Sequence, residues 1–559
     1  MGKTTKVLAL LLSCFVVVAT FFRLRFGVDF TDEAFALAIP YRFLLGDKPF
    51  VDDWTLNQTV GLFLYPMVRA YRAATGGIEG LILFSRYIYF ALSASLAAVA
   101  YFTFRSQLGW ALALLIAASY LAFIPFQIPN LNYYSLGVGL YSAGILFALP
   151  SVLSEEKNKK PLVCGVLHGF AAIAHPALSL AVLFYLACLS AKEFRRLALP
   201  YFIGVIVVAT PALIYFAGNF SAVHHVFLFT LNKYSVSPEY RLGSQIFFRY
   251  MGQLLYTGIT PLLVISSWLL LPLLRRRAMI VILPLMTIAT HLVAMMHLPV
   301  VIDGIGRHFY LLYLALVAPC LLFFLFLRSS KEEFNFAKSL FAFVWVPSVF
   351  AGLVLSAVSN NGLVLVGVAG LPAITTGVVF LWLVVGPTGN RELIAPFSFA
   401  SLTLVILLLF QLFPHKNGRI ENLDSQVEEG PYKGLYTTRF KREYLKKISY
   451  DLKMVAKPDR HVLFYFQFPA GYLLSEMKPS TPSLWTTCIR ADRSECIEYY
   501  KRRMKVGDVV VRMRSNFFRN QLEVAEEFSD PHEPLDTLIT ETHKRVNARG
   551  WYEIYLATN

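Results

Sequence analysis

Apolar stretches long enough to cross a membrane recur along this chain of 559 residues and constrain its fold more than any other feature. A helix needs about 20 apolar residues to span roughly 30 Å of bilayer hydrocarbon. The composition agrees, because 56% of the residues are hydrophobic and only 15% are charged, against about 25% charged in an average globular domain. The sequence therefore predicts an α-helical polytopic membrane protein, with spans near 7–22, 81–104, 108–127, 133–153, 198–217, 251–274, 278–297, 307–328, 339–358, 361–385 and 393–413.

Residues 162–190 are also apolar, but His175-Pro176 interrupts them. Basic residues flank this segment on both sides, and the basic loops of membrane proteins face the cytoplasm. The segment must therefore cross the membrane twice, or enter it and return. We expect two short helices that meet at His175-Pro176, which brings the total to about thirteen transmembrane helices.

The distribution of charge predicts how the chain is oriented. Residues 1–413 hold 27 basic and 15 acidic side chains, so the net charge of +16 indicates membrane topology rather than nucleic-acid binding. A cytoplasmic N-terminus places four basic clusters on the inner side, at 155–160, 192–196, 275–277 and 328–338. Residues 7–22 follow Lys3 and Lys6 as in a signal peptide, but no small-residue cleavage site follows, so we expect a retained span.

We expect the protein to lie in the inner (plasma) membrane. The same orientation divides the chain into two domains. Residues 1–413 form the transmembrane domain, whose first exoplasmic loop is 23–80, and residues 414–559 form a soluble exoplasmic (periplasmic) domain. In the second domain "HVLFYFQF" and "GDVVVRM" are typical of strands, and "RFKREYLKKISYDLKMV" is typical of an amphipathic helix. We therefore expect a small α/β domain. Cys488 and Cys496 lie in it, and whether they pair stays open.

The first exoplasmic loop gathers carboxylates in a chain that is otherwise poor in charge: Asp29, Asp32, Glu33, Asp47, Asp52 and Asp53. One interpretation is structural, because Thr31 is a good N-cap and acids in a first helical turn complement the helix dipole. A helix cap does not require Asp29, Asp52 or Asp53, however. The second interpretation is that Asp32, with Glu33 beside it, deprotonates an acceptor hydroxyl at the membrane surface.

In this chemical interpretation, partial burial raises the pKa of the base towards the working range. The neighbouring acids, Asp52 and Asp53, position the acceptor, or Asp32 and Asp53 bind a divalent cation such as Mg²⁺ or Mn²⁺. A departing phosphate would also need an exoplasmic cation. The candidates are His175, Arg241, Arg307 and His308. Interfacial arginines commonly anchor helix ends, and His175 can equally be a core histidine, so both interpretations stay open.

Two segments of the sequence resemble the GT-C superfamily of polytopic glycosyltransferases, in particular its aminoarabinose-transferase and protein O-mannosyltransferase-like group. They are the "DE" followed by "GDKPFVDDW" in the first loop, and the later "GRHFYLLYLALVAP". The resemblance implies that Asp32 is the catalytic base or orients the acceptor, that Glu33 is its neighbour, and that Arg307 lies near the donor phosphate. The chain departs from the group where relatives carry Glu-Lys-Pro near the end of the first loop, since it reads "WTLNQTVG" there.

The resemblance also implies the reaction. We predict an inverting transfer of a sugar from a polyprenyl-phosphate donor to a lipid, glycan or protein acceptor on the exoplasmic face of the bilayer. A transporter or lipid flippase is the alternative from another class, but such proteins tend to show pseudo-repeats and charges buried within their spans. An outward-facing polysaccharide polymerase or ligase is a third alternative, and is expected to lack the acidic loop after the first span.

Overall fold

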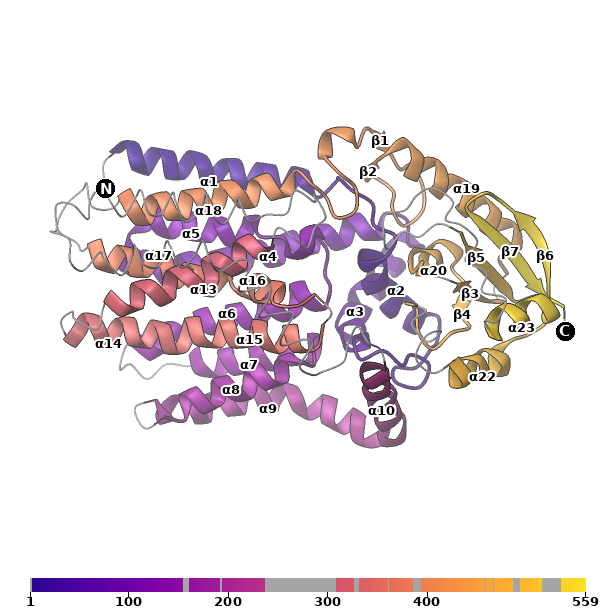
Figure 1. The fold of residues 1–559 in the computed structure, drawn as a ribbon, viewed down its shortest axis with the longest axis horizontal. Helices are drawn as coiled ribbons and strands as arrows, with labels where there is room; N and C mark the ends of the chain where they lie inside the picture. Colours follow the sequence, from indigo (N-terminus) through magenta and orange to yellow (C-terminus); the bar gives the residue numbers. More distant parts are fainter. Residues whose placement is uncertain are drawn as a thin grey trace.

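A computed structural model describes most of the chain, namely residues 3–153, 160–191, 194–236, 308–325, 331–359, 361–385, 394–457, 459–465, 467–485, 493–514 and 534–558. The described residues form a bundle of apolar helices at one end and a smaller α/β region at the other (Figure 1). The N-terminus lies at the far end of the bundle and the C-terminus at the far end of the α/β region, so the two termini mark opposite ends of the long axis (Figure 1).

Within the described residues, five helical stretches are long and apolar enough to cross a membrane. They are α1 (Lys3–Arg23), α4 (Leu81–Leu108), α6 (Tyr133–Leu153), α9 (Arg195–Gly218) and the stretch Phe334–Ala357, which joins α14 (Lys331–Leu340), the π-helical turn Phe341–Trp345 and α15 (Val346–Ala357). Shorter helices complete the bundle: α5 (Trp110–Ala122), α7 (Lys160–Ala174), α8 (Leu178–Leu189), α13 (His308–Leu325), α16 (Val364–Ala369), α17 (Leu371–Val385) and α18 (Ile394–Gln411). A further helix, α10 (Phe220–Val236), lies beyond the end of α9 and outside the bundle (Figure 1), and its Phe229 contacts the ring of Trp54.

These helices confirm that the chain is mainly helical and show the break predicted at His175-Pro176, since α7 ends at Ala174 and α8 begins at Leu178. The two predicted spans at 251–274 and 278–297 lie outside the described residues, so the number of about thirteen spans stays a prediction. Close packing inside the bundle depends on small residues, as is usual between membrane helices. A Cβ on Gly165 of α7 would lie 2.0 Å from the carbonyl oxygen of Tyr201 in α9.

The segment between α1 and α4 folds into two helices, α2 (Asp32–Leu44) and α3 (Gln58–Thr75), which lie between the bundle and the α/β region (Figure 1). Their apolar side chains share one buried core with the start of α4 and with the α/β region. Phe30, for example, contacts the rings of Tyr432, Tyr444 and Phe468. The core therefore crosses the position at 413 where we divided the sequence.

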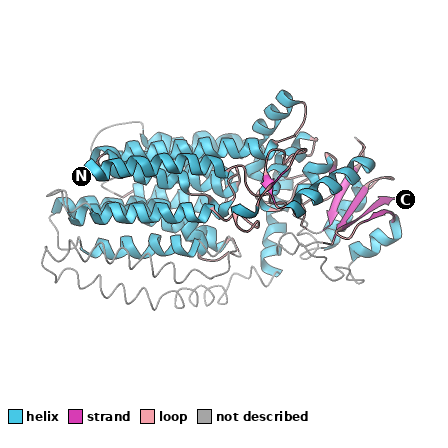
Figure 2. Ribbon diagram, turned by 90° about the horizontal axis from the view of Figure 1, so that it is seen from above, coloured by secondary structure: helices cyan, strands magenta, loops and turns pink. Residues whose placement is uncertain are grey.

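The C-terminal region confirms the predicted α/β character. Its sheet has the strand order β4-β3-β5-β7-β6, with β3 parallel to β4 and β5, and β7 antiparallel to β5 and β6. The strands are β3 (His461–Tyr465), β4 (Lys478–Pro479), β5 (Val509–Met513), β6 (His543–Ala548) and β7 (Tyr552–Ala557). The helices are α19 (Arg439–Val455), α20 (Ala470–Ser475), α22 (Arg493–Arg503) and α23 (Pro534–Thr542). Figure 2 shows the strands grouped at this end of the molecule.

Backbone hydrogen bonds join this region to the segment after α1. A short ribbon of β1 (Ser425–Gln426) and β2 (Tyr436–Thr437) lies beside that segment. Tyr436 donates its N–H to the carbonyl of Arg25 (2.7 Å), and its own carbonyl accepts from the N–H of Gly27 (2.9 Å). Residues from opposite ends of the sequence are thus fixed against one another. Of the two cysteines considered for a disulfide, Cys496 is buried and Cys488 lies outside the described residues, so their pairing stays open.

Candidate functional site

Asp29 caps the helix that begins at Asp32. One carboxylate oxygen of Asp29 accepts from the N–H and the hydroxyl of Thr31 (3.1 and 2.7 Å), and the other accepts from the N–H of Glu33 (2.9 Å). Thr31 occupies the N-cap position, but its side chain accepts no capping hydrogen bond there. Capping is therefore performed by Asp29 and not by Thr31 as the sequence indicated, and the carboxylate of Asp32 is left for other contacts.

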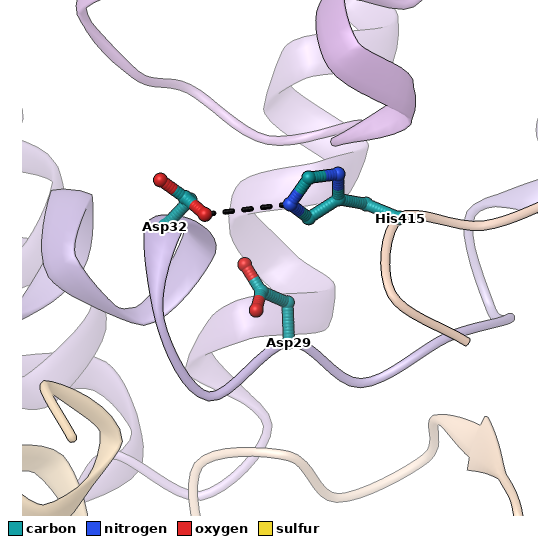
Figure 3. A group of neighbouring side chains, drawn as sticks. All are labelled: Asp29, Asp32 and His415. Atoms are coloured by element: carbon teal, nitrogen blue, oxygen red, sulfur yellow. Dashed lines mark hydrogen bonds and ion pairs between the residues drawn. The ribbon is translucent and has the colours of Figure 1, made fainter. Parts of the chain in front are cut away.

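Asp32 contacts the side chains of a lysine and a histidine from the segment that follows α18. Lys416 donates to Asp32 Oδ2 (2.8 Å) and to the hydroxyl of Thr31 (2.8 Å), and His415 Nε2 lies 3.3 Å from the same Oδ2. Figure 3 shows His415 reaching from its own segment of the chain towards Asp32, with Asp29 beside them. The Asp32 side chain is 32% exposed, whereas Lys416 and His415 are 13% and 12% exposed. The carboxylate is therefore partly exposed to solvent, with an ammonium and an imidazole beside it.

Lys416 and His415 control the protonation of Asp32. Burial by itself would raise the pKa of this carboxyl group, but the charge of Lys416 and the hydrogen bond from His415 outweigh burial. The pKa of Asp32 therefore lies well below its usual range while both partners are in place, and the group is a carboxylate at neutral pH. This direction is opposite to the raised pKa that we expected from burial alone.

Glu33, the neighbour of Asp32, is directed to a different partner. Its carboxylate accepts two hydrogen bonds from Arg86 of α4, from Nε at 2.7 Å and from Nη2 at 2.6 Å, and both side chains are almost fully buried. Arg86 also donates to the carbonyls of Leu24, Phe26 and Gly27. Arg–carboxylate pairs with this bidentate geometry hold both side chains in fixed positions. The Glu33–Arg86 pair anchors α2 and the segment before it to the bundle.

Asp52 and Asp53 belong to a second network, around Arg42 and Arg503. The guanidinium of Arg42 is fully buried and pairs with Asp47 (2.9 Å) and Asp53 (3.2 Å). Arg503 of α22 pairs with Asp47 (2.7 Å) and Asp52 (3.0 Å). Burial raises the pKa of Asp53 although Arg42 is adjacent. Among the described residues, these carboxylates pair with Arg42 and Arg503 and not with Asp32. Because Arg503 belongs to α22, the network ties the loop to the α/β region.

The other predicted binding residues are distributed as follows. His308 begins α13, is buried, and accepts a hydrogen bond from the N–H of Phe126 (3.1 Å). His175 is buried against the rings of Tyr133 and Tyr134, and its described contacts do not include Asp32. Arg241 and Arg307 lie outside the described residues.

A divalent cation was a candidate ligand for Asp32. One atom each of Asp29, Asp32 and His415 lie within 4.8 Å of one another, as in many metal sites. Both oxygens of Asp29 already accept hydrogen bonds from the first turn of α2, however. The ammonium of Lys416 occupies the position beside Asp32 where the charge of a metal ion would lie. With Lys416 in this place the described residues do not fit a divalent cation, and Asp53, which pairs with Arg42, does not join them.

A small pocket of about 30 Å³ lies in the bundle. Its lining is mostly apolar with several hydroxyl groups, and comes from Tyr89, Leu92, Ser93, Leu96, Tyr120, Phe123, Pro125, Ser135, Val138, Gly139, Ser142 and Leu371. Ser135 donates to the carbonyl of Asn130 (2.7 Å), and Asn130 donates to the carbonyl of Glu33 (3.2 Å). Two hydrogen bonds thus connect the pocket wall to the first turn of α2.

Sequence reasoning missed Arg86, His415 and Lys416. The sequence did contain an indication for Arg86, because an ionisable side chain inside an apolar stretch is expected to have a buried partner. His415 and Lys416 follow directly after the last predicted span, and such a position is also typical of a membrane anchor.

The described geometry defines a class of protein with an apolar helical bundle, an α/β region, and a carboxylate that lies beside a lysine and a histidine where the two parts join. No family model matches the chain, and no curated protein matches it. Among solved structures, it is similar to the crystal structure of ArnT from Cupriavidus metallidurans in the apo state, with 13% identity, a TM-score of 0.42, and coverage of 98% of this chain and 97% of that chain. At this identity and TM-score, the likeness by itself assigns neither a family nor an activity.

Proposed function

We propose that the chain is a GT-C-type membrane glycosyltransferase of the inner membrane that transfers a sugar from a polyprenyl-phosphate donor to an exoplasmic acceptor. The observation that carries this proposal is the cluster of Asp32, Lys416 and His415, in which a partly exposed carboxylate lies beside an ammonium and an imidazole. The cluster lies where the apolar bundle meets the α/β region, so a donor with a lipid tail and a polar head can be held there.

The chemistry needs one base and one cationic group. The acceptor hydroxyl attacks the anomeric carbon of the donor sugar, its proton passes to Asp32, and the bond from that carbon to the phosphate oxygen breaks. The electron pair leaves with the phosphate, whose added negative charge is stabilised by the ammonium of Lys416 and by a hydrogen bond from His415. Attack from the face opposite to the phosphate inverts the sugar centre. No second carboxyl group is required, which differs from glycoside hydrolysis.

The donor itself activates the base. With Lys416 on Asp32, the pKa of the carboxyl group is too low for efficient proton abstraction. When the donor phosphate draws Lys416 away, burial remains as the dominant influence and the pKa of Asp32 rises. His415 can follow, because its Nδ1 has no hydrogen-bond partner among the described residues. Proton abstraction thus becomes effective only when a donor is present.

The surroundings of the cluster support the remaining roles. Glu33 positions Asp32 through its pair with Arg86, and Asp52 and Asp53 keep the loop folded. Arg307 and Arg241 are further candidates for the phosphate, and His308 and His175 for the donor. The opposite positions of the termini agree with a cytoplasmic N-terminus and an exoplasmic C-terminal region.

A deletion strain tests the proposal. Mass spectrometry of its exoplasmic glycans and lipids is expected to show the loss of one sugar modification, which returns when the intact gene is supplied. An unchanged profile would overturn the assignment as a transferase. The same experiment identifies the sugar and whether the acceptor is a lipid, a glycan or a protein.

A further inference from the structure

Lys441 is a buried lysine of the α/β region that the mechanism above does not use. Its ammonium donates to three acceptors, the carbonyls of Val28 and Lys416 (both 2.9 Å) and the side-chain oxygen of Asn417 (3.0 Å). An ammonium group has three N–H donors, so these bonds use all of them. The acceptors belong to two segments, one before Asp32 and one that carries Lys416.

The position of Lys441 in its helix is unusual. Thr438 caps α19 by accepting from the N–H of Lys441 (3.3 Å), which fixes this residue in the first turn. The buried residues that follow at helical spacing include Tyr444, Leu445 and Ile448. Lys441 thus occupies a core position on an amphipathic helix, where an apolar side chain would normally lie. Burial of a charge in such a position costs free energy of folding, so a lysine there is expected to have a specific role.

The two segments that Lys441 joins are also packed tightly against each other. Asn417 accepts the N–H of Val28 with the same oxygen that binds Lys441 (3.1 Å). Gly27 has a φ angle of +90°, and a Cβ at this position would lie 2.7 Å from Cβ of Pro414. Little freedom therefore remains between the residues that precede Asp32 and those that precede Lys416.

Lys416 itself has a strained backbone, with a φ angle of +52°. A residue with a Cβ seldom adopts this left-handed conformation, and it persists only where the surroundings enforce it. The carbonyl group of this same residue accepts from Lys441. The strained residue is also the one whose side chain reaches Asp32.

We propose that Lys441 is a positioning residue, which holds the segment 414–417 against the segment 27–29 and thereby sets Lys416 and His415 opposite Asp32. The α/β region is thus an integral part of the catalytic unit and not only a domain that recruits the acceptor. This inference rests on the proposed function for its effect on transfer, but not for its effect on the structure of the two segments.

Two variants of the full-length membrane protein test this role. Lys441→Met keeps the length and the apolar stem of the side chain but removes all three hydrogen bonds, and Lys441→Arg keeps the charge. Lys446→Met is the matched control, because Lys446 is exposed on the same helix. Amide hydrogen exchange of residues 27–29 and 414–417, followed by mass spectrometry, measures whether the segments separate. Transfer is measured in the same preparations, as kcat and as KM for the donor.

We expect Lys441→Met to increase exchange in both segments at least tenfold and to lower kcat at least tenfold, while exchange in the sheet of the α/β region is unchanged. Lys441→Arg is expected to recover a large part of both, and Lys446→Met to match the wild type. Wild-type exchange and wild-type turnover in Lys441→Met would overturn the inference. If the wild-type protein shows no transfer but Lys441→Met still loosens the segments, the proposed function fails while the structural role of Lys441 stands.

Discussion

Lys416 donates a hydrogen bond of 2.8 Å to the carboxylate of Asp32, although 384 positions separate the two residues in the sequence. The pair brings the start of α2 together with the segment that follows α18 and so combines a potential base with a potential phosphate ligand. Because one ammonium cannot bind Asp32 and a donor phosphate equally well at the same time, the pair also predicts that the site changes when a donor binds.

Removal of the Lys416 charge is expected to impair transfer by about 10²- to 10³-fold, which is typical for the loss of a group that stabilises developing negative charge. Lys416→Met is the variant, and Lys433→Met is its control, because Lys433 is half exposed and pairs only with the exposed Glu79 among the described carboxylates. Rates of transfer in membranes that contain equal amounts of protein provide the measurement. Equal rates for the two variants would remove Lys416 from the site.

Chelation is expected to leave transfer unchanged, since Lys416 supplies the positive charge beside Asp32. Activity should therefore persist after treatment with EDTA. If EDTA abolishes transfer and Mg²⁺ or Mn²⁺ restores it, a metal ion replaces Lys416 in the working site and the assignment of the phosphate ligand is wrong.

Substitutions of Asp32 and Glu33 should have different effects on the stability of the fold, although the two residues are adjacent. Asp32→Asn removes an exposed carboxylate and should leave the folded state largely intact. Glu33→Gln leaves Arg86 as an unpaired buried charge, and breaking such a pair costs about 3–5 kcal/mol. Thermal unfolding of the two purified variants measures the difference. A stable Glu33→Gln protein would show that the Arg86 pair is not needed for the fold.

Gly27→Ala should destabilise the junction between the loop and the α/β region. The substitution forces a left-handed φ angle on alanine, at a cost of about 1–2 kcal/mol, and places a Cβ against Pro414. Gly76→Ala is the control, because Gly76 has a similar φ angle of +76° but no atom within 4 Å of the added Cβ. Gly27→Ala is expected to lower the melting temperature more than Gly76→Ala does, and equal shifts would contradict the tight packing of the two segments.

Transfer is expected to decline as the pH rises above about 8 without unfolding of the protein. Burial lowers the pKa of Lys441 from 10.5 to about 8, with Asp29 opposing this change and Lys416 supporting it. A neutral amine has one N–H donor fewer, so the two segments are held less well. Between pH 8 and 10.5 the unfolded chain binds more protons at Lys441 than the folded chain does. The contribution of Lys441 to the free energy of unfolding therefore rises with pH, and deprotonation of this residue does not unfold the protein. Activity lost in step with unfolding would contradict this explanation.

The sequence predicted the helical bundle, the break at His175-Pro176 and the α/β character of the C-terminal region, because hydrophobic periodicity reports local structure directly. It also predicted that Asp32, within the acidic loop, is the base, and this role stays a prediction. It could not predict the partners of Asp32, since a contact between residues 32 and 416 depends on tertiary structure. Lys441 did carry a local signal, because it lies on the apolar stripe of its helix, but a lysine in an amphipathic helix is ordinarily interpreted as solvated.

The most direct test of the account is complementation of the deletion strain with Asp32→Asn, alongside Asp459→Asn as a control at an exposed carboxylate. Both variants should accumulate in the membrane at the wild-type level. We expect Asp32→Asn to restore less than about one hundredth of the sugar modification, as the loss of a general base implies, and Asp459→Asn to restore all of it. Full restoration by Asp32→Asn would contradict the central claim that this carboxylate carries out the transfer.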